Sequence, residues 1–180
     1  KLPASNLSKL ENSIKVAGLA KTRAERIHKI LCTLQEERGE PSFHYLRDMS
    51  DKDIKVELSR FKGLGPKTIS CVLMFSLARP EFPVDTHVLR ISKSMKWIPP
   101  SASRESAYEY LNDVVPPKLK MDLHCLLVTH GRHCHNCAAN RKPQFPPKDG
   151  SKLMCPLVGL NKVTIQTLSK TLVKQVQKMI

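Results

Sequence analysis

Acidic residues, aromatic residues and long apolar runs are all scarce in this sequence. Aspartate and glutamate number 16 against 30 lysines and arginines, which leaves a formal net charge of +14 over 180 residues. Such a charge attracts a polyanion. Because no run is long enough to span a bilayer and no segment resembles a secretory signal, nucleic acid is a better candidate than a membrane. A basic protein whose charge is simply scattered over its surface is the alternative.

Strand patterns are missing as well. No stretch alternates apolar and polar residues between turn signals, whereas apolar residues recur at spacings of three and four. The fold class is therefore predicted to be all-α, and the length suits one domain with a substantial core. Thr22 is expected to cap the second helix, which should end at Gly39. The basic residues of this helix, Arg23, Arg26, Lys29 and Arg38, are expected to lie on a solvated face. Helices are predicted over residues 7–17, 22–38, 50–60, 67–77, 85–96, 104–114 and 119–129. Ser103 is expected to cap the helix over residues 104–114, and Ile54 and Leu58 are expected to face inward.

The six cysteines do not indicate a disulfide framework, since no secretory signal accompanies them and a reducing compartment fits better. Cys32, Cys71 and Cys125 lie in helical patterns and are predicted to be small buried hydrophobic residues. The other three, Cys134, Cys137 and Cys155, fall in or beside a stretch rich in Pro, Lys, Asn and Gly. An irregular loop is expected over residues 133–159.

The stretch from Phe61 to Thr68 predicts a tight hairpin between two helices, a unit of about residues 51–78. Ser50, with Asp53 three positions later, is a helix-start signal. We expect positive φ at both Gly63 and Gly65. A hairpin of this kind can present backbone N–H groups to a phosphate. The residues expected to contact DNA are Lys62, Gly63, Leu64, Gly65 and Thr68.

An amine and a carboxylate follow the hairpin at a fixed interval. Lys67 begins the second helix, and Asp85 stands eighteen residues later in the stretch Pro-Val-Asp-Thr-His. Taken alone, Lys67 is an ordinary phosphate-binding lysine and Asp85 an ordinary helix cap. Taken together with the glycines, the pair is our candidate for a catalytic amine and carboxylate.

This pattern resembles the helix-hairpin-helix DNA glycosylases, the HhH-GPD superfamily, and most of all their endonuclease III branch. The family pattern is Leu-x-Gly-x-Gly-x-Lys-Thr followed by Val-Asp-Thr-His, with Phe61 here in place of the leucine. The resemblance covers about residues 7–134, and the tail after residue 137 is not covered. The chain begins later than the family's first helices, so part of the N-terminal helices is expected to be missing from this sequence.

The resemblance implies a base excision repair enzyme. Lys67 would attack C1′ of a damaged or modified nucleotide and form a Schiff base, and Asp85 would stabilise positive charge or take up a proton. The expected activities are DNA N-glycosylase and AP (β-elimination) lyase. The expected partner is double-stranded DNA, bound by a monomer in the nucleus or another compartment that contains DNA.

Two other functions stay open. A helix-hairpin-helix module can hold DNA without chemistry, and a glycosylase-like chain can be inactive. The module needs the glycines but neither Lys67 nor Asp85, so the enzyme is favoured. A monofunctional glycosylase of the adenine-excising type keeps the aspartate but usually lacks the lysine.

The cysteine loop departs from the family. Endonuclease III relatives often hold a [4Fe–4S] cluster here with four cysteines, whereas this chain offers only three, so the Cys₄ set is incomplete. A Zn²⁺ site of Cys134, Cys137, Cys155 and either His133 or His135 is a chemically reasonable alternative. No metal is the favoured expectation. His124 and His130 are interpreted as hydrogen-bonded helix residues, and His87 as a packed or capping histidine. The predicted organisation is thus a helical core over residues 1–132, the loop over 133–159 and an amphipathic helix over 160–180.

Overall fold

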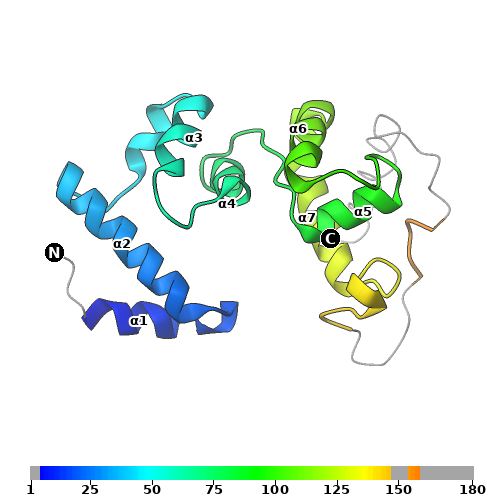
Figure 1. The fold of residues 1–180 in the computed structure, drawn as a ribbon, viewed down its shortest axis with the longest axis horizontal. Helices are drawn as coiled ribbons and strands as arrows, with labels where there is room; N and C mark the ends of the chain where they lie inside the picture. The colour runs from blue at the N-terminus through cyan, green and yellow to red at the C-terminus, as the bar shows by residue number, and fades with distance from the viewer. Residues whose placement is uncertain (1–4, 147–153, 159–180) are drawn as a thin grey trace. The chain divides into compact units, whose positions relative to one another are not determined.

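The computed structural model describes residues 5–146 and 154–158, and this part of the chain contains helices and turns but no strand (Figure 1). The all-α prediction is confirmed. Within these residues no helix is long and apolar enough to cross a membrane. The helix predicted over residues 160–180 lies outside the described residues.

The chain divides into two compact units, residues 1–69 and 70–180, so the boundary falls inside the helix that follows the hairpin. Each unit is described here by itself. The first unit holds α1 (Ser5–Ser13), a 3₁₀ turn (Lys15–Ala17), α2 (Ala20–Arg38), a second 3₁₀ turn (His44–Asp48), α3 (Asp51–Ser59) and the start of α4 (Pro66–Cys71).

In the first unit α1 packs against α2 (Figure 1). Leu19 takes a left-handed conformation with φ 53°, which starts α2 directly at Ala20. The prediction that Thr22 caps this helix is therefore wrong, because the turn closes before Thr22 is reached. Gly39 ends α2 as predicted, in the left-handed conformation that glycine adopts without steric cost.

The predicted helix–hairpin–helix unit is present. Ser50 caps α3 by accepting a hydrogen bond from the backbone N–H of Asp53 at 3.2 Å, and Ile54 and Leu58 face inward as expected. Gly63 has φ +100°, but Gly65 does not have positive φ. That half of the hairpin prediction is wrong. The carbonyl of Gly65 instead accepts the first hydrogen bond of α4, from Ile69 N–H at 3.0 Å, so Gly65 stands at the helix start.

The second unit contains a π-helical turn that continues α4 (Val72–Ser76), α5 (Thr86–Ser94), α6 (Arg104–Val114), a 3₁₀ turn (Pro117–Leu119), α7 (Lys120–His133) and a last 3₁₀ turn (Ala139–Arg141). α5 packs on α7. Ser103 caps α6 as predicted, accepting from Ser106 N–H at 3.1 Å. The core of this unit is built from Phe82, Val84, Val88, Ile91, Met95, Trp97, Ile98, Ala107, Leu111, Val115, Leu127, Cys134, Cys155 and Leu157.

Among the helical cysteines the burial prediction is only partly right. Cys32 and Cys71 are half-buried, but Cys125 is exposed on α7, so the prediction for Cys125 is wrong. Helical periodicity places a residue on one side of a helix, yet a small residue at the edge of the apolar stripe can face either the core or the solvent.

Candidate functional site

The hairpin borders a groove on the first unit. This groove has a volume of about 340 Å³ and runs between α2 and the start of the hairpin. Its lining residues are Thr22, Glu25, Arg26, Lys29, Ile30, Thr33, Arg60, Phe61 and Lys62. We call it the hairpin groove. Four of its side chains are basic and one is acidic, so it suits an anionic strand.

Arg26, which lines this groove, lies against Gly63 of the hairpin. A Cβ built on Gly63 would stand 2.6 Å from Cδ of Arg26, so the arginine stem crosses the glycine face. Sequence reasoning had assigned Arg26 and Lys29 to a solvated helix face. Only the long-range contact between α2 and the hairpin reveals that both line the groove.

A hydrogen-bonded network fixes the approach to the hairpin. Arg60, at the end of α3, donates two bonds to Glu37 at 2.9 and 2.7 Å and further bonds to Glu57 at 3.1 Å. Tyr45 donates to Glu57. The hydrogen bonds from Arg60 lower the pKa of Glu37. Burial acts to raise the pKa of Glu57, but the hydrogen bonds from Tyr45 and Arg60 outweigh it, so that pKa is lowered as well. The network thus ties α2, the 3₁₀ turn before α3, and α3 together.

The predicted DNA-contact residues are exposed on the hairpin, except for one that packs inward. Lys62, Gly63, Gly65 and Thr68 are exposed. Leu64 is half-buried and packs on the small core of Ile30, Leu34 and Phe61, so its side chain supports the hairpin.

Lys67 is the second residue of α4 and is exposed. Pro66 before it suits the first helical position because its fixed φ matches the helix and it lacks an N–H that would need a partner. Within the described residues no hydrogen bond or ion pair holds the Lys67 amine. The amine therefore remains available to a ligand.

Asp85 caps α5, as predicted, through one carboxylate oxygen. Oδ1 accepts from the backbone N–H groups of His87 at 2.9 Å and Val88 at 2.8 Å. In the described part of the chain Oδ2 has no hydrogen-bond partner. The carboxylate is half-buried, so one oxygen anchors it and the other can face a reacting group.

The stretch that leads to Asp85 is held by side chains, because it is buried but not helical. Asn112 Oδ1 accepts from Phe82 N–H at 2.8 Å, and Lys120 donates to the carbonyl of Pro80 at 2.7 Å. His124 Nδ1 donates to the carbonyl of Pro83 at 2.8 Å, which matches the interpretation of His124 as a hydrogen-bonded helix residue. These contacts from α6 and α7 set where Asp85 enters α5.

His87 is buried, as expected for a packed histidine. Its Nδ1 lies 3.1 Å from Nη2 of Arg90. A Cβ added to Gly131 would lie 2.7 Å from the same Nδ1, so α5 and α7 approach closely at this glycine.

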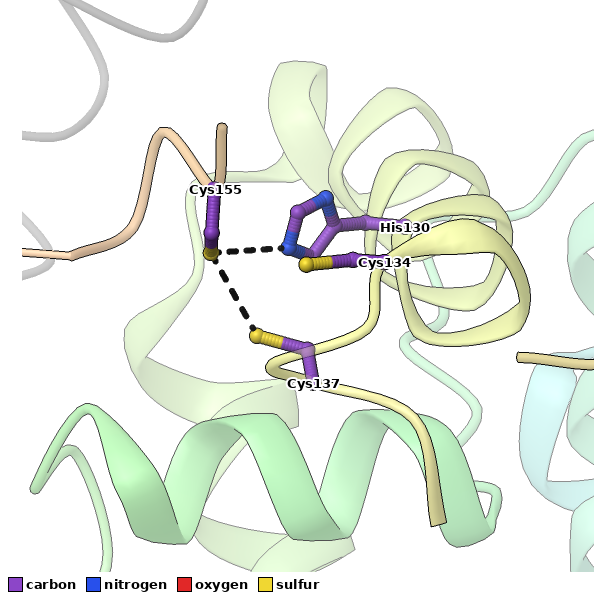
Figure 2. A group of neighbouring side chains, drawn as sticks. All are labelled: His130, Cys134, Cys137 and Cys155. Carbon is purple, nitrogen blue, oxygen red and sulfur yellow. Dashed lines mark hydrogen bonds between the residues drawn. The ribbon is translucent and has the colours of Figure 1, made fainter. Parts of the chain in front are cut away.

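Three cysteines and a histidine meet at the end of α7 (Figure 2). They are His130, Cys134, Cys137 and Cys155, and their ligand atoms all lie within 4.8 Å of one another. The histidine is neither of the two proposed from the sequence. His133 is exposed and its Nδ1 donates to Thr129 O at 2.8 Å. The missed signal is helical: His130 and Cys134 are four residues apart and so share a face.

Burial shapes the protonation of this group. It lowers the pKa of His130 and raises the pKa of the Cys137 and Cys155 thiols. A [4Fe–4S] cluster does not fit, because the donor set has three thiols rather than four and the ligand atoms are too close to surround four irons and four sulfides.

Comparison with known proteins agrees with the helix–hairpin–helix unit. The family model described as "HhH-GPD superfamily base excision DNA repair protein" matches residues 1–117, which include Lys67 and Asp85 and stop short of the cysteine group. The chain belongs to the HhH-GPD superfamily. A provisionally named DNA glycosylase of Arabidopsis thaliana is 51% identical over 151 residues, which are 83% of this chain and 51% of that protein.

Other members of the superfamily are more distant. Endonuclease III of Escherichia coli (strain K12) is 33% identical over 132 residues, 73% of this chain and 56% of that enzyme. The solved structure of a non-covalent endonuclease III–DNA complex superposes with a TM-score of 0.60 at 27% identity, covering 93% of this chain and 67% of that one. The chain spans about half the length of the first of these relatives. Its endonuclease III-like fold is thereby established.

Proposed function

We propose that this HhH-GPD chain is a base excision DNA glycosylase with AP lyase activity. The observation that carries the proposal is that both motif positions hold a usable group: an exposed amine at Lys67 and a carboxylate at Asp85 with one oxygen unbonded. A module that only holds DNA needs neither group. The kinship with DNA glycosylases supports the same choice.

In the proposed reaction the target nucleotide is first flipped out of the duplex, because its C1′ is inaccessible in the stack. The deprotonated amine of Lys67 attacks C1′, and the C1′–N bond breaks with its electron pair passing to the base, which leaves with a proton. The sugar ring opens to a protonated imine between Nζ and C1′. Loss of a C2′ proton then expels the 3′ phosphate, and water hydrolyses the imine to free Lys67.

Asp85 acts on the first step. The breaking of a glycosidic bond passes through a state with positive charge at C1′ and the ring oxygen. The unbonded Oδ2 of Asp85 stabilises that charge or accepts the proton of the attacking amine. Its Oδ1 keeps the side chain oriented through the cap of α5.

DNA binding is assigned to the hairpin and its groove. The backbone N–H groups at Gly63 and Gly65 contact a phosphate, and Lys62, Arg26 and Lys29 add charge beside them. None of these contacts reads a base edge. The damaged base itself is selected elsewhere, so the substrate is assigned only as a damaged or modified base in double-stranded DNA, in a compartment that contains DNA.

Borohydride trapping tests the proposal directly, since it reduces the imine to a permanent protein–DNA bond. The full chain is incubated with duplexes that each carry one lesion: an oxidised pyrimidine, 8-oxoguanine, mismatched thymine, methylated cytosine or an abasic site. We expect a trapped adduct with at least one duplex. Lys67→Ala abolishes it while leaving DNA affinity within a few fold, and Lys67→Arg abolishes it too because a guanidinium stays protonated.

Lys62→Ala is the matched control, because it removes an exposed lysine of the same hairpin and should lower affinity but still give adduct at saturating protein. Adduct at the wild-type level in Lys67→Ala would refute the role of Lys67. Wild-type protein that binds every duplex and processes none would identify a DNA-holding module instead.

A further inference from the structure

The His130 group has the dimensions of a site for one tetrahedral metal ion. Cys137 Sγ and Cys155 Sγ are 3.7 Å apart, and Cys155 Sγ is 3.5 Å from His130 Nε2. Bond lengths for Zn²⁺ at a tetrahedral angle place two thiolates about 3.8 Å apart and a thiolate about 3.5 Å from an imidazole nitrogen. The remaining separations, all within 4.8 Å, need to shorten by about 1.3 Å at most, which small side-chain rotations supply.

Other uses of three neighbouring thiols fit less well. All six cysteines are free, and 3.7 Å is far longer than the roughly 2.05 Å of a disulfide. Three cysteines cannot form a complete set of pairs in any case. Catalytic thiols sit in exposed, positively charged surroundings, whereas Cys134 and Cys155 are buried.

We propose that His130, Cys134, Cys137 and Cys155 bind one Zn²⁺ ion as a closed structural site. Three thiols and one imidazole form a Cys₃His donor set, which favours zinc over harder cations such as Mg²⁺. On binding, the three thiols lose three protons and form three Zn–S bonds, and the neutral imidazole gives the fourth bond through Nε2. No open coordination position remains, so the ion has a structural rather than a catalytic role.

The ligands are arranged by elements that do not depend on the ion. His130 lies one helical turn before Cys134, which ends α7. The carbonyl of Cys134 accepts hydrogen bonds from Cys137 N–H at 3.2 Å and Ala138 N–H at 2.8 Å, which closes a turn that brings the Cys-x-x-Cys thiols together. Arg90 of α5 donates from Nε to the Cys137 carbonyl at 2.7 Å and from Nη2 to the Gly131 carbonyl at 3.3 Å.

Cys155 is separated from Cys137 by seventeen residues in the sequence, so a structural role for the zinc is clearest at this ligand. It is buried together with Leu157 against the core of the second unit. An ion bound both to Cys155 and to the end of α7 holds together two segments that are distant in the sequence, and its bonds offset the conformational entropy that bringing them together costs. The zinc therefore fastens the segment 154–158 to the second unit.

Metal analysis of the full chain, purified without a polyhistidine tag, tests the proposal. We expect about one zinc per chain, no acid-labile sulfide, and none of the visible absorption of an iron–sulfur cluster. Cys137→Ser and His130→Ala should each lose most of the zinc. Chelation of the wild-type protein should lower its melting temperature by roughly 5 °C or more, since a closed structural site is bound only in the folded state.

Two matched controls are available on the same helix. Cys125→Ser removes an exposed thiol and His133→Ala an exposed imidazole, and both should keep the full zinc content. His130→Cys gives a Cys₄ set and should retain zinc, which separates loss of a ligand from loss of fold.

Cobalt substitution gives a second readout, because a tetrahedral Cys₃His site has intense visible bands that shift in His130→Cys. Stoichiometric iron and sulfide, zinc well below one equivalent, or zinc that survives Cys137→Ser and disappears in His133→Ala would overturn the proposal.

Discussion

At Asp85, one carboxylate oxygen caps a helix and the other is left unbonded, so structure and chemistry use different atoms of one side chain. Asp85→Asn separates them. The amide oxygen can keep both hydrogen bonds of the cap, and asparagine caps about as well as aspartate, so the unfolding free energy should change by less than about 0.5 kcal/mol. The variant lacks the negative charge that stabilises the positive charge at C1′, so base excision should fall by at least about a hundredfold.

Single-turnover excision and thermal unfolding of Asp85→Asn measure the two effects separately. Asp85→Ala is the comparison variant, because it removes the cap as well and should cost about 1 kcal/mol more in stability. If Asp85→Asn excised the base at the wild-type rate per folded molecule, Asp85 would be only a cap.

At the scale of the hairpin, the two glycines have different roles. Gly63 needs positive φ and lies against Arg26, whereas Gly65 has neither constraint, and a Cβ there meets nothing within 4 Å. Gly63→Ser should therefore destabilise the protein by about 1–2 kcal/mol, the cost of placing an L-residue in the left-handed region. Gly65→Ser should leave stability unchanged, since serine is at least as good as glycine at a helix start.

DNA affinity distinguishes the roles further. If the backbone at Gly65 approaches a phosphate, then Gly65→Ser should weaken binding in spite of its normal stability, because its side chain occupies the approach. Urea unfolding and duplex binding of the two serine variants measure this. Normal stability of Gly63→Ser would contradict the backbone conformation, and normal binding of Gly65→Ser would remove the hairpin from the DNA interface.

The network around Arg60 makes the first unit sensitive to acid. The pKa values of Glu37 and Glu57 are both lowered in the folded state from their ordinary 4.5. A carboxyl whose folded pKa is depressed contributes stability that is present above the unfolded pKa and is lost as pH falls through the folded pKa. Stability should therefore decline below about pH 4.5 as these groups are protonated.

Arg60→Gln isolates this contribution. It removes the cation that both carboxylates bind, so its stability deficit should be largest near neutral pH and should shrink as the pH falls below about 4.5. Urea unfolding of both proteins, followed by far-UV circular dichroism across that range, gives the comparison. A deficit that stayed constant with pH would show that Arg60 acts only through packing on Phe61, over whose ring it lies at 4.2 Å.

At the scale of the whole molecule, the sequence predicted helix caps correctly where a side chain bonds to the backbone of its own helix. Ser50, Asp85 and Ser103 were all recognisable as caps, because the bond that each makes spans only two or three residues. Thr22 is also a residue type that favours helix caps, but the prediction for it was wrong, because the left-handed conformation of Leu19 starts the helix at Ala20. A sequence pattern does not show which of two neighbouring residues adopts the left-handed conformation.

Contacts between distant segments were the harder part. Three thiols were visible in the sequence, and the four-residue spacing of His130 and Cys134 was a local signal, but only the structure shows that Cys155 lies beside both. Arg26 and Lys29 were likewise assigned to solvent, because their groove exists only where α2 meets the hairpin. The placement of Lys67 and Asp85 in one catalytic site stays a prediction.

The net charge of +14 becomes a binding property only where basic side chains gather, as they do in the hairpin groove. Affinity for undamaged duplex should fall linearly on a log–log plot against salt, with a slope near −0.9 per phosphate neutralised. We expect about three to six such contacts, fewer than for larger DNA-binding proteins.

Lys29→Ala should reduce the slope by about one. Lys52→Ala, which removes an equal charge from the exposed start of α3 outside the groove, should leave it unchanged. Equal slopes for the two variants would mean that the charge acts as a diffuse field, and an affinity indifferent to salt would exclude phosphate contacts altogether.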